Sequence, residues 1–351
     1  MAEYVKDSNN EELFRSEITL ELWQELYEAA AQLKSLEPWK WFSEVDLAEI
    51  YLRGRDEPYY CSIQGMFDDK YGFDVYRGYD GLVSFSAYIN SLDLPEYVSK
   101  NKRNCLSCTW GERARLKNRD LKLIKNLNLK YRGSSEWPLF RDIKAGYVPW
   151  FLDVQDTAEF ISVMYEFIRV FSELVSKYDV DDINEGERIY TRYDEEDDCW
   201  YNEIVAPLNE IEAVTDGCVI TDELLLRRLK LKRYNGAVLE FDMPYLPVSV
   251  KEGNPEKRPF YPRIVLLCDA YTLEDIDRCF MDIRENPGDT ILNILIDYIE
   301  ENGRPEEIYI RDADMFGIIG HLCRETDISV HMTNSLRAVD VFIQELIMTM
   351  K

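Results

Sequence analysis

The chain opens with an amphipathic helical pattern. Apolar residues recur at intervals of three and four positions, with Thr19 placed to cap the helix and Pro38 placed to end it. These apolar positions are Trp23, Leu26, Tyr27, Ala30 and Leu33. The spacing predicts a helix that packs one face against the core of a domain.

Apolar runs in the N-terminal half predict strands that alternate with further helices. Residues 59–67 and 71–77 predict two strands joined by the short polar turn 68–70, which is typical of a hairpin. We expect further strands over 105–110 and 147–154, and helices over 80–91, 118–127 and 156–177. This half of the chain is therefore predicted to be mixed α+β.

The C-terminal part alternates strand and helix patterns. Ile264–Cys268 is a continuous apolar run, which is typical of a strand covered on both faces. It begins a predicted ββαβαβα order, with strands over 264–268, 278–284, 308–310 and 328–332 and helices over 287–301, 315–324 and 336–350. Helices that alternate with strands predict right-handed crossovers and a largely parallel sheet.

Two polar stretches divide the chain. Residues 179–187 are acidic, and residues 251–262 contain one glycine and three prolines. Between them we expect strands over 188–193, 200–206 and 237–241 and a helix over 221–233. A chain of 351 residues is long enough for two or three cores. We therefore expect an α+β protein with an N-terminal mixed domain (1–179), a small middle unit (180–255) and a C-terminal α/β domain (256–351).

Composition favours a globular protein of the cytoplasm. Hydrophobic residues make up 46% of the chain, which is enough for packed cores. Charged residues from Lys6 onward leave no room for a signal peptide, and the most apolar helix, over 158–175, is interrupted by charges. The eight cysteines are scattered, which fits reduced thiols better than disulfides. We expect cytoplasmic localisation and no membrane partner.

The charge distribution is uneven. The formal net charge of −26 disfavours nucleic acid as a partner over most of the surface. Residues 100–132, however, hold eleven basic residues against only Glu112 and Asp120. This segment is predicted to be either an anion-binding patch, with Trp110 and Tyr131 as stacking surfaces, or a solvated face that pairs with the acidic remainder of the chain.

Aromatic residues suggest a ligand site beside this segment. Trp39 and Trp41 follow the first helix, and Tyr147 and Trp150 precede the long helix over 156–177. We predict that these four rings converge on a cleft against the basic segment, where Arg113 and Arg115 would bind a ligand. The alternative for the Trp39–Phe42 cluster is a place in the core.

Two aspartates end predicted strands in the C-terminal domain. Asp269 follows the strand over 264–268, and Asp312 follows the strand over 308–310. They can be turn and cap residues, or they can hold a metal ion, since magnesium prefers carboxylate oxygens. The predicted ββαβαβα order of this domain resembles the ribonuclease H-like fold, in which carboxylates follow the first and fourth strands. The resemblance implies a two-magnesium site formed by Asp269 and Asp312, with a third ligand from Asp340 or Glu345.

The chain also resembles a group of uncharacterised bacterial proteins that pair two domains of unknown function. The motifs that carry this resemblance are Leu36-Glu37-Pro38-Trp39, Gly146-Tyr147-Val148-Pro149-Trp150, Pro262-Arg263-Ile264-Val265 and Glu301-Asn302-Gly303-Arg304-Pro305. The resemblance implies a two-domain plan and no particular activity.

Other motifs narrow the possible functions. The chain lacks the phosphate-binding loop of NTPases, the dinucleotide-binding glycine turn, the nucleophile elbow of hydrolases and the zinc motif of metalloproteases. Cys105 and Cys108 form a lone CxxC, which we interpret as structural thiols. We therefore expect a binding or regulatory protein without catalysis or cofactor, whose partner is a protein or a small anionic ligand. The alternative is a magnesium-dependent nuclease or phosphoesterase.

Overall fold

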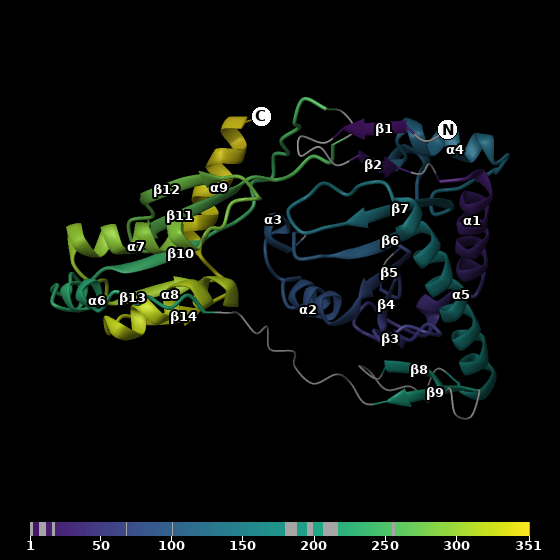
Figure 1. Cartoon of the computed structure of the whole chain (residues 1–351), viewed down its shortest axis with the longest axis horizontal. Coiled ribbons are helices and arrows are strands. Elements are labelled where there is room, and N and C mark those ends of the chain that lie inside the picture. Colours follow the sequence, from purple (N-terminus) through teal and green to yellow (C-terminus); the bar gives the residue numbers. More distant parts are fainter. Residues whose placement is uncertain are drawn as a thin grey trace. The chain divides into compact units, whose positions relative to one another are not determined.

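The computed structural model describes residues 3–6, 12–15, 18–67, 69–99, 101–179, 188–194, 199–205, 217–254 and 257–350. The chain forms two compact units, which are interleaved along the sequence (Figure 1). The N-terminal unit comprises Met1–Ile89, Arg103–Lys144 and Pro149–Ile211. The C-terminal unit comprises Asn90–Lys102, Ala145–Val148 and Glu212–Lys351.

A seven-stranded sheet is the centre of the N-terminal unit, in the order β7-β6-β5-β4-β3-β8-β9. Neighbouring strands from β3 to β7 are antiparallel, and β8 is parallel to β3. The strands are β3 (Leu47–Ile50), β4 (Tyr59–Gln64), β5 (Gly72–Arg77), β6 (Cys105–Gly111), β7 (Trp137–Ile143), β8 (Arg188–Asp194) and β9 (Cys199–Val205). A separate two-stranded ribbon is formed by β1 (Glu3–Lys6) and β2 (Glu12–Arg15).

Helices cover both faces of this sheet. α1 (Leu20–Ser35) and α5 (Val154–Lys177) lie side by side (Figure 1). They bury their apolar faces with Cys61, Phe73 and Val75 of the sheet. α2 (Gly78–Ile89) packs on the opposite face with Tyr60 and Tyr76, because strand side chains alternate between faces. The remaining helical elements are η1 (Pro38–Lys40), η2 (Arg113–Arg115) and α4 (Asn118–Asn126).

The C-terminal unit is built on a five-stranded sheet in the order β12-β11-β10-β13-β14. β10 is parallel to β13 and β13 to β14, whereas β11 is antiparallel to both of its neighbours. The strands are β10 (Val238–Asp242), β11 (Arg263–Asp269), β12 (Asp275–Met281), β13 (Glu307–Ile310) and β14 (Ser329–Met332). The sheet is therefore mixed, and the prediction of a largely parallel sheet is corrected.

Helices also cover both faces of this second sheet. α6 (Glu223–Lys230), α7 (Gly288–Asn302) and α8 (Ala313–Glu325) pack on one face, and α9 (Arg337–Met350) packs on the other with α3 (Glu96–Ser99). Ile264–Cys268 in β11 is fully buried, as predicted for a strand covered on both sides. Among the described residues, no helix is long and apolar enough to cross a membrane.

The α+β class and the ββαβαβα order from β11 to α9 agree with the sequence prediction. The segment predicted as a middle unit is divided instead: β8 and β9 complete the first sheet, and α6 and β10 belong to the second unit. The strand predicted over 147–154 is replaced by two isolated bridges, Tyr147 with Phe260 and Asp142 with Trp150. Residues 180–187 of the predicted acidic linker lie outside the described residues.

Candidate functional site

The structure does not bring Asp269 and Asp312 together. Asp269 lies opposite Leu239 near the start of β10, and Leu239 lies opposite Ile308 of β13. Asp312 follows Ile308 by four residues, which places it about 13 Å farther along the strand direction at an extended rise of about 3.3 Å per residue. The two carboxylates therefore lie toward opposite ends of the strands, and the prediction of a shared metal site is corrected.

Both aspartates have the local roles that were the alternative interpretation. One Asp269 oxygen accepts backbone N–H groups from Tyr271 and Thr272 at 2.9 and 2.8 Å, which forms a turn. Asp312 caps α8 by accepting the N–H of Met315 at 3.1 Å. Such contacts satisfy backbone donors that have no partner inside the helix.

Asp312 lies instead beside a network of charged side chains. Its Oδ2 is 2.8 Å from Nζ of Lys102. The buried Arg311 donates from Nη1 to Asp242 at 2.8 Å and from Nη2 to Asp340 at 2.7 Å. Lys102, Asp242, Arg311, Asp312 and Asp340 all belong to the C-terminal unit, and we call them the charge network.

Burial and charge act against each other in the charge network. Burial raises the pKa of Asp242 to about 6, although the Arg311 guanidinium opposes this shift. Burial would also raise the pKa of Asp312, but the Lys102 ammonium and the Met315 N–H outweigh it and hold that pKa below its usual range. In the described part of the chain, no three His, Cys, Asp or Glu side chains gather closely enough to hold a metal ion.

The other candidate ligand, Glu345, does not join the network. It lies on the exposed side of α9, and Asp340 is half-buried near the start of the same helix. The hydroxyl of Tyr97 donates to Asp340 at 2.5 Å, so this carboxylate is shared between Tyr97 and Arg311.

The predicted aromatic cleft is not formed by its four residues. Trp39 is buried with its ring centroid 4.4 Å from that of Tyr71, and Trp41 packs edge-on against Phe171 in the same core. Tyr147 belongs to the C-terminal unit, whereas Trp150 belongs to the N-terminal unit. Trp110 is buried in the core, so it offers no stacking surface. The alternative of core packing therefore holds for Trp39 and Trp41.

The basic segment does form an exposed surface. Eight basic residues from η2, α4 and the turn that follows are exposed to solvent, and we call them the basic face: Arg113, Arg115, Lys117, Arg119, Lys122, Lys125, Lys130 and Arg132. Apart from Lys117, none of them forms an ion pair with a described residue. Lys102 and Arg103 lie elsewhere, paired with Asp312 and Asp74, and Lys100 lies outside the described residues.

Of the two acidic residues in the segment 100–132, Glu112 is exposed at the start of η2, whereas Asp120 already has partners. Asp120 is buried beneath α4, where its two oxygens accept hydrogen bonds from Arg141 at 3.0 and 2.7 Å. Oδ2 of Asp120 also accepts the backbone N–H of Lys117 at 2.8 Å. Asp120 therefore fixes the start of α4 and does not neutralise the exposed cations.

Aromatic rings lie beneath several of these cations. The Phe151 ring centroid is 4.5 Å from Cζ of Arg119 and 5.4 Å from Nζ of Lys117. Lys117 also lies 5.5 Å from the Trp150 ring, and Arg113 lies 5.9 Å from the Trp137 ring. Of the predicted ligand residues, Arg113, Arg115 and Trp150 therefore lie on or beside the basic face.

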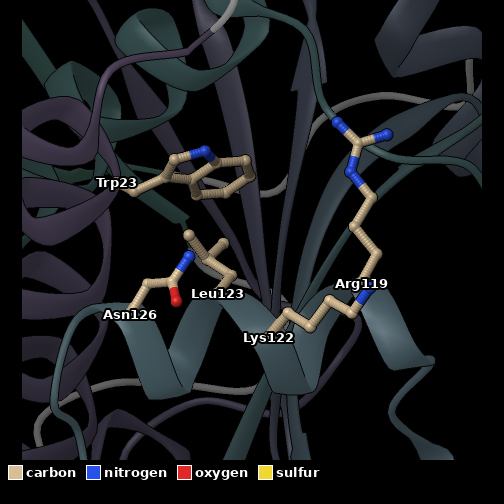
Figure 2. A pocket seen from close by; sticks show the side chains of 5 residues that line it. All are labelled: Trp23, Arg119, Lys122, Leu123 and Asn126. Atoms are coloured by element: carbon tan, nitrogen blue, oxygen red, sulfur yellow. The ribbon is translucent and has the colours of Figure 1, made fainter.

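A pocket of about 350 Å³ opens between α1 and α4. It is lined by Trp23, Arg119, Lys122, Leu123 and Asn126. Figure 2 shows the Trp23 indole and the Arg119 guanidinium on opposite sides, with Leu123 between them and the Asn126 amide on the side of Trp23. Four of the five residues come from α4, so the pocket is continuous with the basic face.

Comparisons with known proteins agree with the two-domain plan. Residues 23–192 match the family model described as "Domain of unknown function (DUF7309)", and residues 225–347 match "Domain of unknown function (DUF6930)". The expectation of two domains of unknown function is confirmed. Neither the curated proteins nor the solved structures contain a significant match.

Sequence reasoning missed three residues of this surface. Trp23 belongs to the apolar stripe of α1, and its spacing is that of an ordinary packing residue. Phe151 falls within a predicted strand that does not form, and Asn126 has no distinguishing neighbour. The one available signal was the density of basic residues in 113–132, which identified α4 but not the Trp23 ring that lines the pocket with it.

Proposed function

We propose that this protein is a non-catalytic binding protein whose N-terminal unit holds a phosphate-bearing ligand on the basic face. The observation that carries the proposal is the set of seven exposed cations that lack an ion-pair partner among the described residues. In a chain with a net charge of −26, acidic side chains are abundant, yet none of the described ones forms an ion pair with these seven cations. An external anion would relieve the mutual repulsion of these cations.

The chemistry of the basic face suits phosphate. Arginine binds phosphate through a planar fork of donors, and lysine binds it as a point charge. The Arg119 guanidinium is positioned by the Phe151 ring rather than by a carboxylate, so its outward N–H groups stay available to a ligand. The buried Asp120–Arg141 pair supports the helix from below, which gives the cations a rigid platform.

The charge network of the C-terminal unit supports a proposal about fold. When β10 is counted as the first strand, Asp242 ends the first strand and Asp312 follows the fourth, where the ribonuclease H-like superfamily carries carboxylates. We propose that this unit has a ribonuclease H-like topology in which Asp242, rather than Asp269, occupies the first position. The protein's own cations, Arg311 and Lys102, pair with these carboxylates, which supports a structural role over the magnesium-dependent alternative.

Titration calorimetry with tripolyphosphate tests the proposed binding. Replacing Lys122, Lys125 and Lys130 together by alanine is expected to weaken binding at least about tenfold, because each lost phosphate contact removes a charge-assisted bond. The matched control replaces Lys177, Lys230 and Lys257 by alanine. These lysines pair with carboxylates elsewhere in the protein, and their replacement changes the net charge by the same amount. Equal losses in both triple variants, or no binding by the unaltered protein, would overturn the proposal.

A further inference from the structure

We infer that the pocket between α1 and α4 holds the base of a nucleotide whose phosphates lie on the basic face. This inference rests on the proposed function, because the same cations supply the phosphate contacts. It adds a ligand class, since a phosphate alone needs no aromatic pocket.

The size and walls of the pocket suit a flat ring. Its volume of about 350 Å³ lies at the small end of the range for ligand pockets, which begins at about 300 Å³. The Trp23 indole forms one wall and Leu123 lies between that wall and Arg119 (Figure 2). A planar heterocycle can therefore contact an aromatic face and an aliphatic side chain at once.

Trp23 has the features of a stacking surface. Its side chain is partly buried against the hydrophobic core, yet within the described residues no other aromatic ring packs on it and its indole N–H has no hydrogen-bond partner. Other tryptophans of this unit are engaged: Trp39 packs on Tyr71, Trp41 on Phe171 and Trp137 on Tyr131. Stacking of a base on an aromatic ring strengthens binding by about tenfold or more.

The polar groups of the pocket are divided between its two sides. Arg119 and Lys122 lie opposite Trp23, and neither has an ion-pair partner among the described residues. The amide of Asn126 lies on the side of Trp23 and likewise has no partner there. The amide can donate hydrogen bonds to the edge of a base and accept one from it, while the two cations can bind the phosphates of the same nucleotide.

This division of groups favours a nucleotide over other anions. Inorganic phosphates and sugar phosphates would use Arg119 and Lys122 but leave Trp23 and Asn126 without a role. A nucleotide uses all four side chains, with its base and its phosphates at opposite sides of one small pocket. Free nucleotides and single-stranded nucleic acid share this chemistry, and Lys125, Lys130 and Arg132 extend the cationic surface beyond one nucleotide.

The test compares ATP with tripolyphosphate, which carries the phosphates without the base. We expect ATP to bind about tenfold more tightly to the unaltered protein. Trp23→Leu should abolish this advantage while tripolyphosphate affinity stays within about twofold, and Trp23→Phe should keep most of it. Gln24→Ala, on the neighbouring exposed position of α1, is the matched control and should change neither affinity. Circular dichroism and melting temperature confirm that each variant is folded.

The outcomes separate the two proposals. Equal affinities for ATP and tripolyphosphate, or an ATP advantage that survives in Trp23→Leu, would overturn the nucleotide inference and leave the phosphate-binding proposal intact. If the unaltered protein binds neither ATP nor tripolyphosphate, both proposals are overturned. A fluorescein-labelled oligodeoxyadenylate identifies the source: tighter, strongly salt-dependent binding than that of ATP supports single-stranded nucleic acid, and no gain over ATP supports a free nucleotide.

Discussion

The Lys102 ammonium lies 2.8 Å from the Asp312 carboxylate, although the two residues are 210 positions apart in the chain. Their side chains are about one-quarter and one-third exposed, which makes this a partly buried ion pair. It attaches the segment 90–102 to the second sheet at the carboxyl ends of β10 and β13, where Asp242 and Arg311 also lie.

Lys102→Met is expected to destabilise the protein by about 1–2 kcal/mol at neutral pH, because Asp312 loses its counter-ion while partial exposure limits the cost. The native pKa of Asp312 is lowered, so its stabilising contribution is present above the unfolded pKa and is lost as pH falls through the native value. Urea unfolding of both proteins should therefore show a difference that shrinks in acid. Lys257→Met, which removes an exposed pair with Glu252, is the control, and a loss as large in that variant would contradict this account.

Asp242 should give the opposite pH dependence. Its native pKa of about 6 exceeds the unfolded value, so the native state holds the proton longer and stability declines as pH rises through about 4 to 6. Between about pH 5 and about pH 7.5 the protein should lose about 1 kcal/mol relative to Asp242→Asn. Carbon-detected NMR of the carboxyl group provides a direct check. A titration midpoint near the ordinary aspartate value would refute it.

The Asp120–Arg141 pair is expected to be important for the stability of the basic face. Asp120→Asn leaves the buried Arg141 without its counter-ion and removes an ideal acceptor for the Lys117 N–H, so unfolding should require about 3 kcal/mol less free energy. Denaturant unfolding measures this change. Asp93→Asn, at an exposed position, is the control. A change below about 0.5 kcal/mol would mean that the pair does not support α4.

Addition of magnesium distinguishes a non-catalytic binding protein from a magnesium-dependent nuclease or phosphoesterase. Because Asp269 and Asp312 lie toward opposite ends of the strands and Asp312 is paired with Lys102, millimolar magnesium should shift the melting temperature by less than about 1 °C. Calcium is the matched control ion. A specific rise with magnesium that Asp312→Asn abolishes and Asp269→Asn does not would support a metal site on the charge network instead.

Local patterns predicted the elements whose signals are local. The helix after Thr19 forms as expected, because both its apolar spacing and its cap are encoded within a few residues. β7 was missed because Pro138 lowers its strand signal, and the structure places it at the sheet edge, where a proline is tolerated. Four-residue β3 is too short to show a period.

The arrangement of the candidate sites depended on pairings between distant segments. β10 lies between β11 and β13 in the sheet, although it precedes both strands in the chain and a polar stretch separates it from β11. That insertion puts Asp242 beside Arg311 and leaves Asp269 toward the far end of the strands, and no local pattern encodes it. The pocket likewise requires Trp23 of α1 to meet α4, whereas the basic composition of 113–132 was visible in the sequence alone.

The interleaving of the two units limits how the protein can be divided. A fragment that ends at residue 211 would carry Tyr97 and Lys102 without Asp340 and Asp312, the carboxylates that they bind. The complementary fragment would retain Asp312 and Asp340 without Lys102 or the Tyr97 hydroxyl. Separate expression of the two sequence halves therefore yields two incomplete folding units, and binding measured on such halves would report on altered surfaces. A chain that holds all of these contacts must span at least residues 97–340.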